Sequence, residues 1–370
     1  MKYSLSFPGR IIFGAGTVKD LPDLIPADAR ILLVTGRHAE KDGLLEFMQH
    51  LLIGFETTSI CGIEAEPPLY EVDKLIQAGR YSSSTAIIAV GGGSVIDAAK
   101  TAAALIPLEG FTADYFYDRL KIPGKGLFFA ALPTTAGTGA EITPNAVLTD
   151  TEVSIKKSIR HQSMFADIAI IDPELTYSSP PALTAASGLD AFTQAVESYI
   201  SKGANTVTRL LAGKSASLIM ANLVAACQAP PAAAARSAMA EGSMLGAMAF
   251  TQSGLGAVHG LAHPLGAKLK IPHGLCCAVL LIPVLKANRP SCRPQLKELA
   301  LICGFDSADS FLAGIAGIKS KLNIPDTFTK FGMDEEHFNF ILENCRSGSM
   351  QKNPRKFSDP ELLEILKGLC

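Results

Sequence analysis

Four short, uninterrupted apolar runs constrain the fold of the first half of this chain more than any other feature. They are RILLVT (30–35), TAIIAV (85–90), LFFAAL (127–132) and IAIID (168–172), with helix-compatible sequence between successive runs. A strand that is apolar on both faces is typical of a parallel sheet covered by helices on each side. The first half is therefore predicted to be an α/β domain built on a parallel sheet.

The character of the sequence changes after residue 180, where long segments rich in Ala, Leu and Met replace the strand-like runs. Residues 183–201, 208–228 and 234–252 show the spacing of apolar side chains that indicates helices. A length of 370 residues suggests about two domains. The Pro- and Ser-rich stretch at 178–181 marks the boundary, so we expect an α/β domain over 1–179 and an all-helical domain over 180–370.

Composition excludes several classes of partner. The 33 basic and 35 acidic residues give a net charge of −2, which disfavours nucleic acid and anionic membranes as ligands. The eight cysteines form no CxxC pair and are expected to be reduced thiols. The N-terminal residues lack the apolar region of a signal peptide, and no stretch of about twenty apolar residues is free of turn formers or charge. We therefore expect a cytoplasmic protein.

Two glycine-containing loops follow strands in the pattern of phosphate-binding sites. In AVGGGSVIDAAK (89–100), three glycines and a serine separate a strand from a helix, and backbone N–H groups at such a helix start bind phosphate. In ALPTTAGTGAE (131–141), Thr134, Thr135 and Thr138 alternate with glycines in the same position after the next strand. Ordinary connecting turns have similar composition, but two such loops at one edge of a sheet indicate a ligand there.

The residue after the strand at 30–35 bears on which dinucleotide would bind. An acidic side chain at that position would accept hydrogen bonds from the ribose 2′-OH and repel a 2′-phosphate. This chain instead has Gly36, Arg37 and His38. A small residue followed by a guanidinium suits a 2′-phosphate, which favours NADP(H), although a loop arginine is more often simply exposed.

A second set of polar residues in the helical half has the spacing of metal ligands. Asp190 and Gln194 are four residues apart and share a helix face. His259 and His263 are also four apart, and His273 follows a proline in a PHG turn. An isolated histidine is more often a packed or capping residue. Three histidines within fifteen positions, facing a carboxylate, indicate a divalent-metal site that polarises a substrate oxygen.

The motifs together resemble the iron-containing (group III) alcohol dehydrogenases over nearly the whole chain. The segments GGGSVIDAAK, LPTTAGTGAEIT, DPEL, GLDAFTQAVESYIS and GAVHGLAHPLGAKLKIPHG occur in that family's order. The resemblance implies a dinucleotide-binding α/β domain followed by an all-helical domain, the dehydroquinate synthase-like architecture, with the site in the cleft between them. It also implies a homodimer.

The resemblance assigns roles residue by residue. It implies that Asp190, His259 and His273 bind Fe²⁺ or Zn²⁺, that His263 lies near the nicotinamide and carries the proton, and that Gln194 stands where the family has a fourth ligand, a histidine. An amide oxygen is a weaker donor than imidazole. The cofactor residues, taken with the loops above, are Arg37, Gly92, Gly93, Ser94, Asp97, Thr134, Thr135, Thr138 and Lys156. Asn145 and Phe250 are candidates for the substrate pocket, although Phe250 is also typical of a core residue.

These roles predict hydride transfer between NAD(P) and a small alcohol or aldehyde. One alternative is a lyase, or a polyol or glycerol-phosphate dehydrogenase, on the same fold. Such sites need several cationic groups, whereas the motifs offer mainly Lys268 and Lys270. Another alternative is a metal-free binding homologue that has lost catalysis, which Gln194 alone would suggest.

Overall fold

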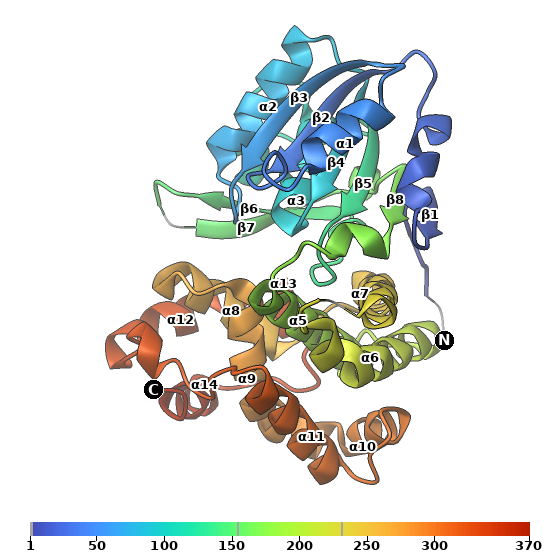
Figure 1. Cartoon of the computed structure of the whole chain (residues 1–370). Coiled ribbons are helices and arrows are strands. Elements are labelled where there is room, and N and C mark those ends of the chain that lie inside the picture. Colours follow the sequence, from blue (N-terminus) through green and yellow to red (C-terminus); the bar gives the residue numbers. More distant parts are fainter. Residues whose placement is uncertain (1–2, 154, 231) are drawn as a thin grey trace. The chain divides into compact units, whose positions relative to one another are not determined.

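The computed structural model describes residues 3–153, 155–230 and 232–370, which form two compact units. The α/β unit comprises Phe7–Thr135 and Gly139–Ser179. The helical unit comprises residues 3–6, Ala136–Thr138 and Pro180–Cys370. Figure 1 labels the helices and strands of both units.

The α/β unit is built on a parallel sheet with the strand order β1-β8-β5-β4-β2-β3 (Figure 1). The four apolar runs form its inner strands, as the sequence predicts. The outer strands β1 and β3 are polar or only partly buried, because an edge strand has a neighbour on one side only. The strands are β1 (Arg10–Phe13), β2 (Arg30–Gly36), β3 (Glu56–Ile63), β4 (Ala86–Gly91), β5 (Phe128–Pro133) and β8 (Ile168–Ile171).

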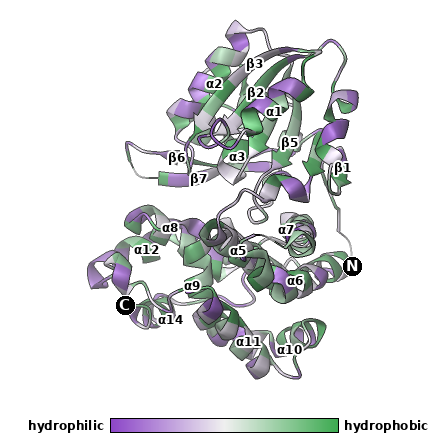
Figure 2. Cartoon of the chain, viewed as in Figure 1, coloured by the Kyte–Doolittle hydropathy of each residue, from purple (hydrophilic) through white to green (hydrophobic). Residues whose placement is uncertain are grey.

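Both faces of the sheet are buried, because alternate side chains of each inner strand enter different cores. Leu32 and Ile87 pack with α2 (Leu69–Tyr81) and α3 (Gly93–Leu105) on one face. Their neighbours Leu33 and Ile88 pack with α1 (Leu44–Leu51) and the 3-10 helix η1 (Thr17–Leu24) on the other. In Figure 2 the inner strands β2 and β5 are largely green while α2 carries purple positions, as a two-sided covering of helices requires.

The remaining elements of this unit are a short helix and an antiparallel hairpin. Helix α4 spans Thr112–Phe116, and the hairpin pairs β6 (Asn145–Asp150) with β7 (Ile155–Arg160). The hairpin follows the threonine-rich loop in the chain, and Asp97 and Lys100 of α3 bind its backbone. Helix α3, which follows the glycine loop, and the hairpin, which follows the threonine-rich loop, are therefore held together by hydrogen bonds.

The helical unit packs its helices around α5, whose residues are buried on nearly every side from Gly188 to Ile200. A helix buried all round is normally apolar, yet α5 carries a carboxylate or amide at 190, 194 and 197. No helix among the described residues is long and apolar enough to cross a membrane. The helices are α5 (Pro181–Ile200), α6 (Thr206–Ala226), α7 (Ala233–Ser253), α8 (Ala257–Leu269), α9 (His273–Asn288), α10 (Arg293–Ile302), α11 (Ala308–Lys321), α12 (Phe338–Asn344), α13 (Gly348–Lys352) and α14 (Asp359–Lys367).

Candidate functional site

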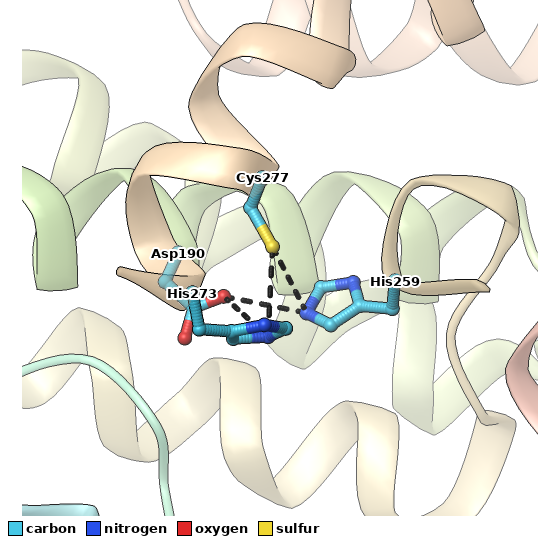
Figure 3. Close-up of side chains that lie close together, drawn as sticks. All are labelled: Asp190, His259, His273 and Cys277. Atoms are coloured by element: carbon cyan, nitrogen blue, oxygen red, sulfur yellow. Dashed lines mark hydrogen bonds and ion pairs between the residues drawn. The ribbon is translucent and has the colours of Figure 1, made fainter. Parts of the chain in front are cut away.

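Four side chains from three helices of the helical unit converge on one point (Figure 3). Asp190 comes from α5, His259 from α8, and His273 and Cys277 from α9. One donor atom from each lies within 4.8 Å of the donor atoms of the others. Asp190 Oδ1 is 3.3 Å from His259 Nε2 and 3.8 Å from His273 Nε2. Carboxylate, imidazole and thiol donors at such separations are a typical ligand set for a divalent transition metal.

The PHG turn brings His273 to α5 because its glycine permits a close approach. A Cβ atom at Gly274 would lie 2.2 Å from the carbonyl oxygen of Ala186, one turn of α5 before Asp190. The chain reaches this point through Lys270, which ends α8 in a left-handed conformation with φ 53°, and Pro272, the N-cap of α9. Any larger side chain at Gly274 would push His273 away from Asp190.

Glu197, two turns after Asp190 on α5, fixes the orientation of His259. Its Oε2 lies 2.7 Å from His259 Nδ1 and accepts a hydrogen bond from the Gly256 N–H at 2.9 Å, and its Oε1 accepts one from the Val258 N–H at 2.6 Å. With one proton held on Nδ1, His259 can offer its Nε2 lone pair to a cation once Nε2 has lost its own proton. The same buried carboxylate satisfies N–H groups at the start of α8, where the helix dipole favours negative charge.

Buried acceptor atoms without well-formed hydrogen bonds test whether these residues fit a cation. Asp190 is 2% exposed, and its Oδ1 makes no well-formed hydrogen bond among the described residues, although it lies 3.3 Å from His259 Nε2 and 3.8 Å from His273 Nε2. The amide of Gln194 donates from Nε2 to Asp190 Oδ2 at 3.1 Å, and its Oε1 has no hydrogen-bond partner in the described part of the chain. Each such group costs about 1–3 kcal/mol when left unsatisfied. A divalent cation beside Asp190 Oδ1 would remove that cost, so the residues fit a metal.

The electrostatics of the cluster make protons and a cation compete for the same atoms. Burial acts to lower the pKa of His259, but Cys277, Asp190 and Glu197 raise it well above its ordinary value. Burial raises the pKa of the Cys277 thiol to about 12, against the opposing effect of His259. A metal that binds these ligands must displace their protons, and its affinity must therefore fall as the pH is lowered.

His263 lies beside this cluster as the sequence spacing suggests. Its ring stacks on that of His273, with centroids 4.9 Å apart and planes inclined by 16°. Its centroid is 6.5 Å from that of His259. The three histidines of the PHG segment therefore form one group. The role of His263 as the proton carrier stays a prediction.

The predicted phosphate loop in the α/β unit has the features of a strand-to-helix turn that approaches its neighbours closely. A Cβ at Gly91 would lie 2.5 Å from Val95, so only glycine allows α3 to begin so near β4. Gly92 is the N-cap of α3, and it has no side chain to cap the first N–H groups. Gly93 and Ser94 begin the helix, and Ser94 Oγ accepts a hydrogen bond from the Glu66 N–H at 3.0 Å.

Three other predicted cofactor residues of the α/β unit lie at the same edge of the sheet. Arg37 directly follows β2, and Thr134 and Thr135 directly follow β5. Parallel strands end at one edge, and the backbone N–H of Thr134 donates to Gly91 O at 3.0 Å. The structure therefore brings the threonine and glycine loops together, as the sequence predicts.

Three more predicted residues of this unit have partners of their own. Asp97 accepts a hydrogen bond from the Val147 N–H at 2.9 Å, and burial raises the pKa of its carboxyl to about 6 despite Lys100. Lys156 Nζ pairs with Glu66 Oε1 at 2.6 Å. Asn145, proposed for the substrate pocket, begins β6, and its carbonyl accepts from Lys100 Nζ at 2.8 Å.

The last two predicted residues belong to the helical unit. Thr138 lies in the segment Ala136–Thr138, where a Cβ at Gly137 would lie 2.6 Å from Ser187 Cβ of α5. Phe250 lies near the end of α7 and is partly exposed, unlike a residue of the central core. Their roles in cofactor and substrate binding stay predictions.

Sequence reasoning missed Glu197 and Cys277. Glu197 completes a spacing of i, i+4 and i+7 with Asp190 and Gln194, which marks one polar face on an otherwise apolar helix. Cys277 follows His273 by one helical turn. Both signals are present in the sequence, but neither has meaning until α5, α8 and α9 are known to meet.

Comparison with known proteins decides the family. The model described as iron-containing alcohol dehydrogenase matches residues 8–173, and the model described as the C-terminal part of the Fe-containing alcohol dehydrogenase family matches residues 184–370. The chain belongs to the iron-containing alcohol dehydrogenase family. The family expected from the motifs is therefore confirmed. The predicted fold class and the predicted oxidoreductase activity on CH–OH groups are confirmed as well.

Known members of the iron-containing alcohol dehydrogenase family match this chain over nearly its whole length. The 1,3-propanediol dehydrogenase of Klebsiella pneumoniae is 35% identical over 352 residues, 91% of this chain and 90% of its own. The NADPH-dependent butanol dehydrogenase of Clostridium saccharobutylicum is 30% identical over 383 residues, 99% of this chain and 97% of its own. The solved structure of sulfoacetaldehyde reductase from Bifidobacterium kashiwanohense, in complex with NAD+, is also similar. It matches this chain with a TM-score of 0.93 and 29% sequence identity, and the match covers 100% of this chain and 99% of that chain.

Proposed function

We propose that this family member reduces small aldehydes, and oxidises the corresponding alcohols, with a divalent metal held by Asp190, His259 and His273. The observation that supports the metal best is Asp190 Oδ1, which is buried beside two imidazole nitrogens and makes no well-formed hydrogen bond among the described residues. When bound, Fe²⁺ or Zn²⁺ supplies Lewis-acid polarisation of the substrate oxygen.

The chain's own residues prepare the helical unit for this chemistry. Glu197 keeps the proton of His259 on Nδ1, so that Nε2 is available as a donor. Gln194 holds Asp190 Oδ2 and leaves Oδ1 directed at the imidazoles. His263, stacked on His273 and partly exposed, is placed to pass a proton between the site and solvent through its ring nitrogens.

The α/β unit would hold the dinucleotide, whose nicotinamide supplies or accepts the hydride. Gly92, Gly93 and Ser94 offer a helix start for the pyrophosphate. We propose NADP(H) as the preferred cofactor, because Arg37 rather than an acidic residue follows β2. One relative is named NADPH-dependent, while another binds NAD+ in its solved structure.

The experiment that tests the proposal combines metal analysis with turnover. Freshly purified protein should contain about one iron or zinc per chain and should oxidise NADPH in the presence of short aldehydes. Protein that binds no metal and shows no turnover after addition of Fe²⁺ or Zn²⁺ would contradict it and would favour a binding homologue.

We further propose that the protein is a homodimer, which light scattering coupled to size-exclusion chromatography tests. We also propose that it works in a reducing compartment such as the cytoplasm, which accords with its free cysteines.

A further inference from the structure

We propose that Cys277 is the fourth protein ligand of the metal, so that a thiolate supplies the donor that Gln194 was expected to supply. This inference rests on the proposed metal function of the site. It concerns a residue that the sequence spacing left as an ordinary buried thiol.

The contacts of Cys277 differ from those of the other buried cysteines. The Sγ atoms of Cys276, Cys292 and Cys345 each contact a backbone carbonyl oxygen, at 3.8, 3.3 and 3.3 Å respectively. The Sγ of Cys277 instead lies 3.6 Å from His273 Nε2 and 3.9 Å from His259 Nε2. Figure 3 shows this sulfur directed at both imidazole rings. Its thiol therefore faces the ligand atoms rather than the backbone.

Four of the six distances between donor atoms are close to those of a tetrahedral site. Nitrogen or oxygen ligands about 2.1 Å from zinc lie about 3.4 Å apart at a tetrahedral angle, and a sulfur at about 2.3 Å lies about 3.6 Å from such a nitrogen. Asp190 Oδ1 lies 3.3 and 3.8 Å from the two Nε2 atoms, and Cys277 Sγ lies 3.6 and 3.9 Å from them. The other two pairs of donor atoms, His259 with His273 and Asp190 with Cys277, lie within 4.8 Å of one another.

Gln194 then has a positioning role. Its Nε2 donates to Asp190 Oδ2, the oxygen that does not face the imidazoles. A neutral amide oxygen is also a poorer donor for Fe²⁺ or Zn²⁺ than a thiolate. On binding, the sulfur forms a bond to the metal and the thiol proton leaves to solvent. A soft thiolate among the ligands favours Zn²⁺ and Co²⁺ over Mg²⁺ and Mn²⁺.

Cobalt substitution tests the ligand directly. Metal-free protein, kept under reducing conditions, is titrated with Co²⁺ while the near-ultraviolet sulfur-to-cobalt charge-transfer band is recorded, and Zn²⁺ affinity is measured against a competing chelator. The wild type should show the band. Cys277→Ala should lose it and bind Zn²⁺ at least about tenfold more weakly. Removing the thiol opens a coordination position, so turnover is not used as the readout.

Cys276→Ala is the matched control, because it removes an adjacent buried thiol whose Sγ lies 3.8 Å from the carbonyl oxygen of Ile271. It should keep both the band and the affinity. A band and an affinity unchanged in Cys277→Ala, with circular dichroism showing that it is folded, would overturn the proposal while leaving the metal site intact. A loss of affinity confined to Gln194→Ala would assign the fourth donor to the amide. A wild type that binds neither cation would instead contradict the proposed function itself.

Discussion

Replacing Glu197 with glutamine should weaken both metal binding and the start of α8. The wild-type carboxylate accepts from three donors: His259 Nδ1, the Gly256 N–H and the Val258 N–H. A glutamine keeps one acceptor oxygen and presents an NH₂ group to the remaining donor. Placed with its oxygen toward His259 and Gly256, the amide leaves the buried N–H of Val258 unsatisfied, at a cost of about 1–3 kcal/mol in the free energy of unfolding.

Metal affinity should fall by about 10- to 100-fold in Glu197→Gln, the usual effect of changing the hydrogen-bond partner of a ligating histidine, because a neutral amide oxygen is a weaker acceptor for the His259 Nδ1–H than the carboxylate. That loss corresponds to about 1.4 to about 2.8 kcal/mol of binding free energy. Chelator competition with Zn²⁺ measures the affinity, and urea denaturation of the metal-free protein measures the stability. Glu364→Gln, which changes an exposed carboxylate on α14, is the control. Wild-type Zn²⁺ affinity in Glu197→Gln would refute the assignment of Glu197 as the group that orients His259.

Three further predictions concern the α/β unit. Lys100→Met should lower the free energy of unfolding by about 3–5 kcal/mol, because the buried ammonium donates to three backbone carbonyls and lies beside Asp97. Urea denaturation measures this change, and a loss under about 1 kcal/mol would contradict it. Burial raises the pKa of Glu141 to about 7, so the wild type should lose stability relative to Glu141→Gln as the pH rises from about 5 to about 8. If the free energies of unfolding of the wild type and Glu141→Gln changed with pH in parallel, the raised pKa of Glu141 would be contradicted. Arg37→Ala should raise KM for NADPH more than KM for NADH, and an unchanged ratio of the two constants would show that this side chain does not contact a 2′-phosphate.

The inner strands could be predicted from the sequence because each is buried on both faces and must be apolar throughout. The edge strands could not. Strand β3, ETTSICGI, pairs on one side only and keeps polar side chains at positions where an inner strand would have none. The hairpin strand β7, IKKSIR, is mostly exposed and has no apolar run to mark it.

The candidate site was predictable where ligand spacing is local and unpredictable where it depends on packing. The close spacing of three histidines indicates a metal site, and the family resemblance assigns Asp190, His259 and His273 as its ligands. Glu197 was missed because its contacts with α8 form only when the first turn of that helix lies against α5. That contact requires a glycine at position 256, where a Cβ would lie 2.6 Å from Glu197 Oε1. Cys277 was missed because its contacts with two imidazoles arise only when α8 and α9 pack together.

Because Gly274 lets the start of α9 lie against α5, metal binding should affect the local stability of the helical unit. With His259 at the start of α8 and His273 at the start of α9, a bound cation ties the first turns of two helices to the middle of a third. Loss of that tie should let the segment between them open locally long before the whole unit unfolds. Amide hydrogen exchange around residues 256–277 would then report metal loading, and proteases would find their first cleavage sites there in metal-starved cells.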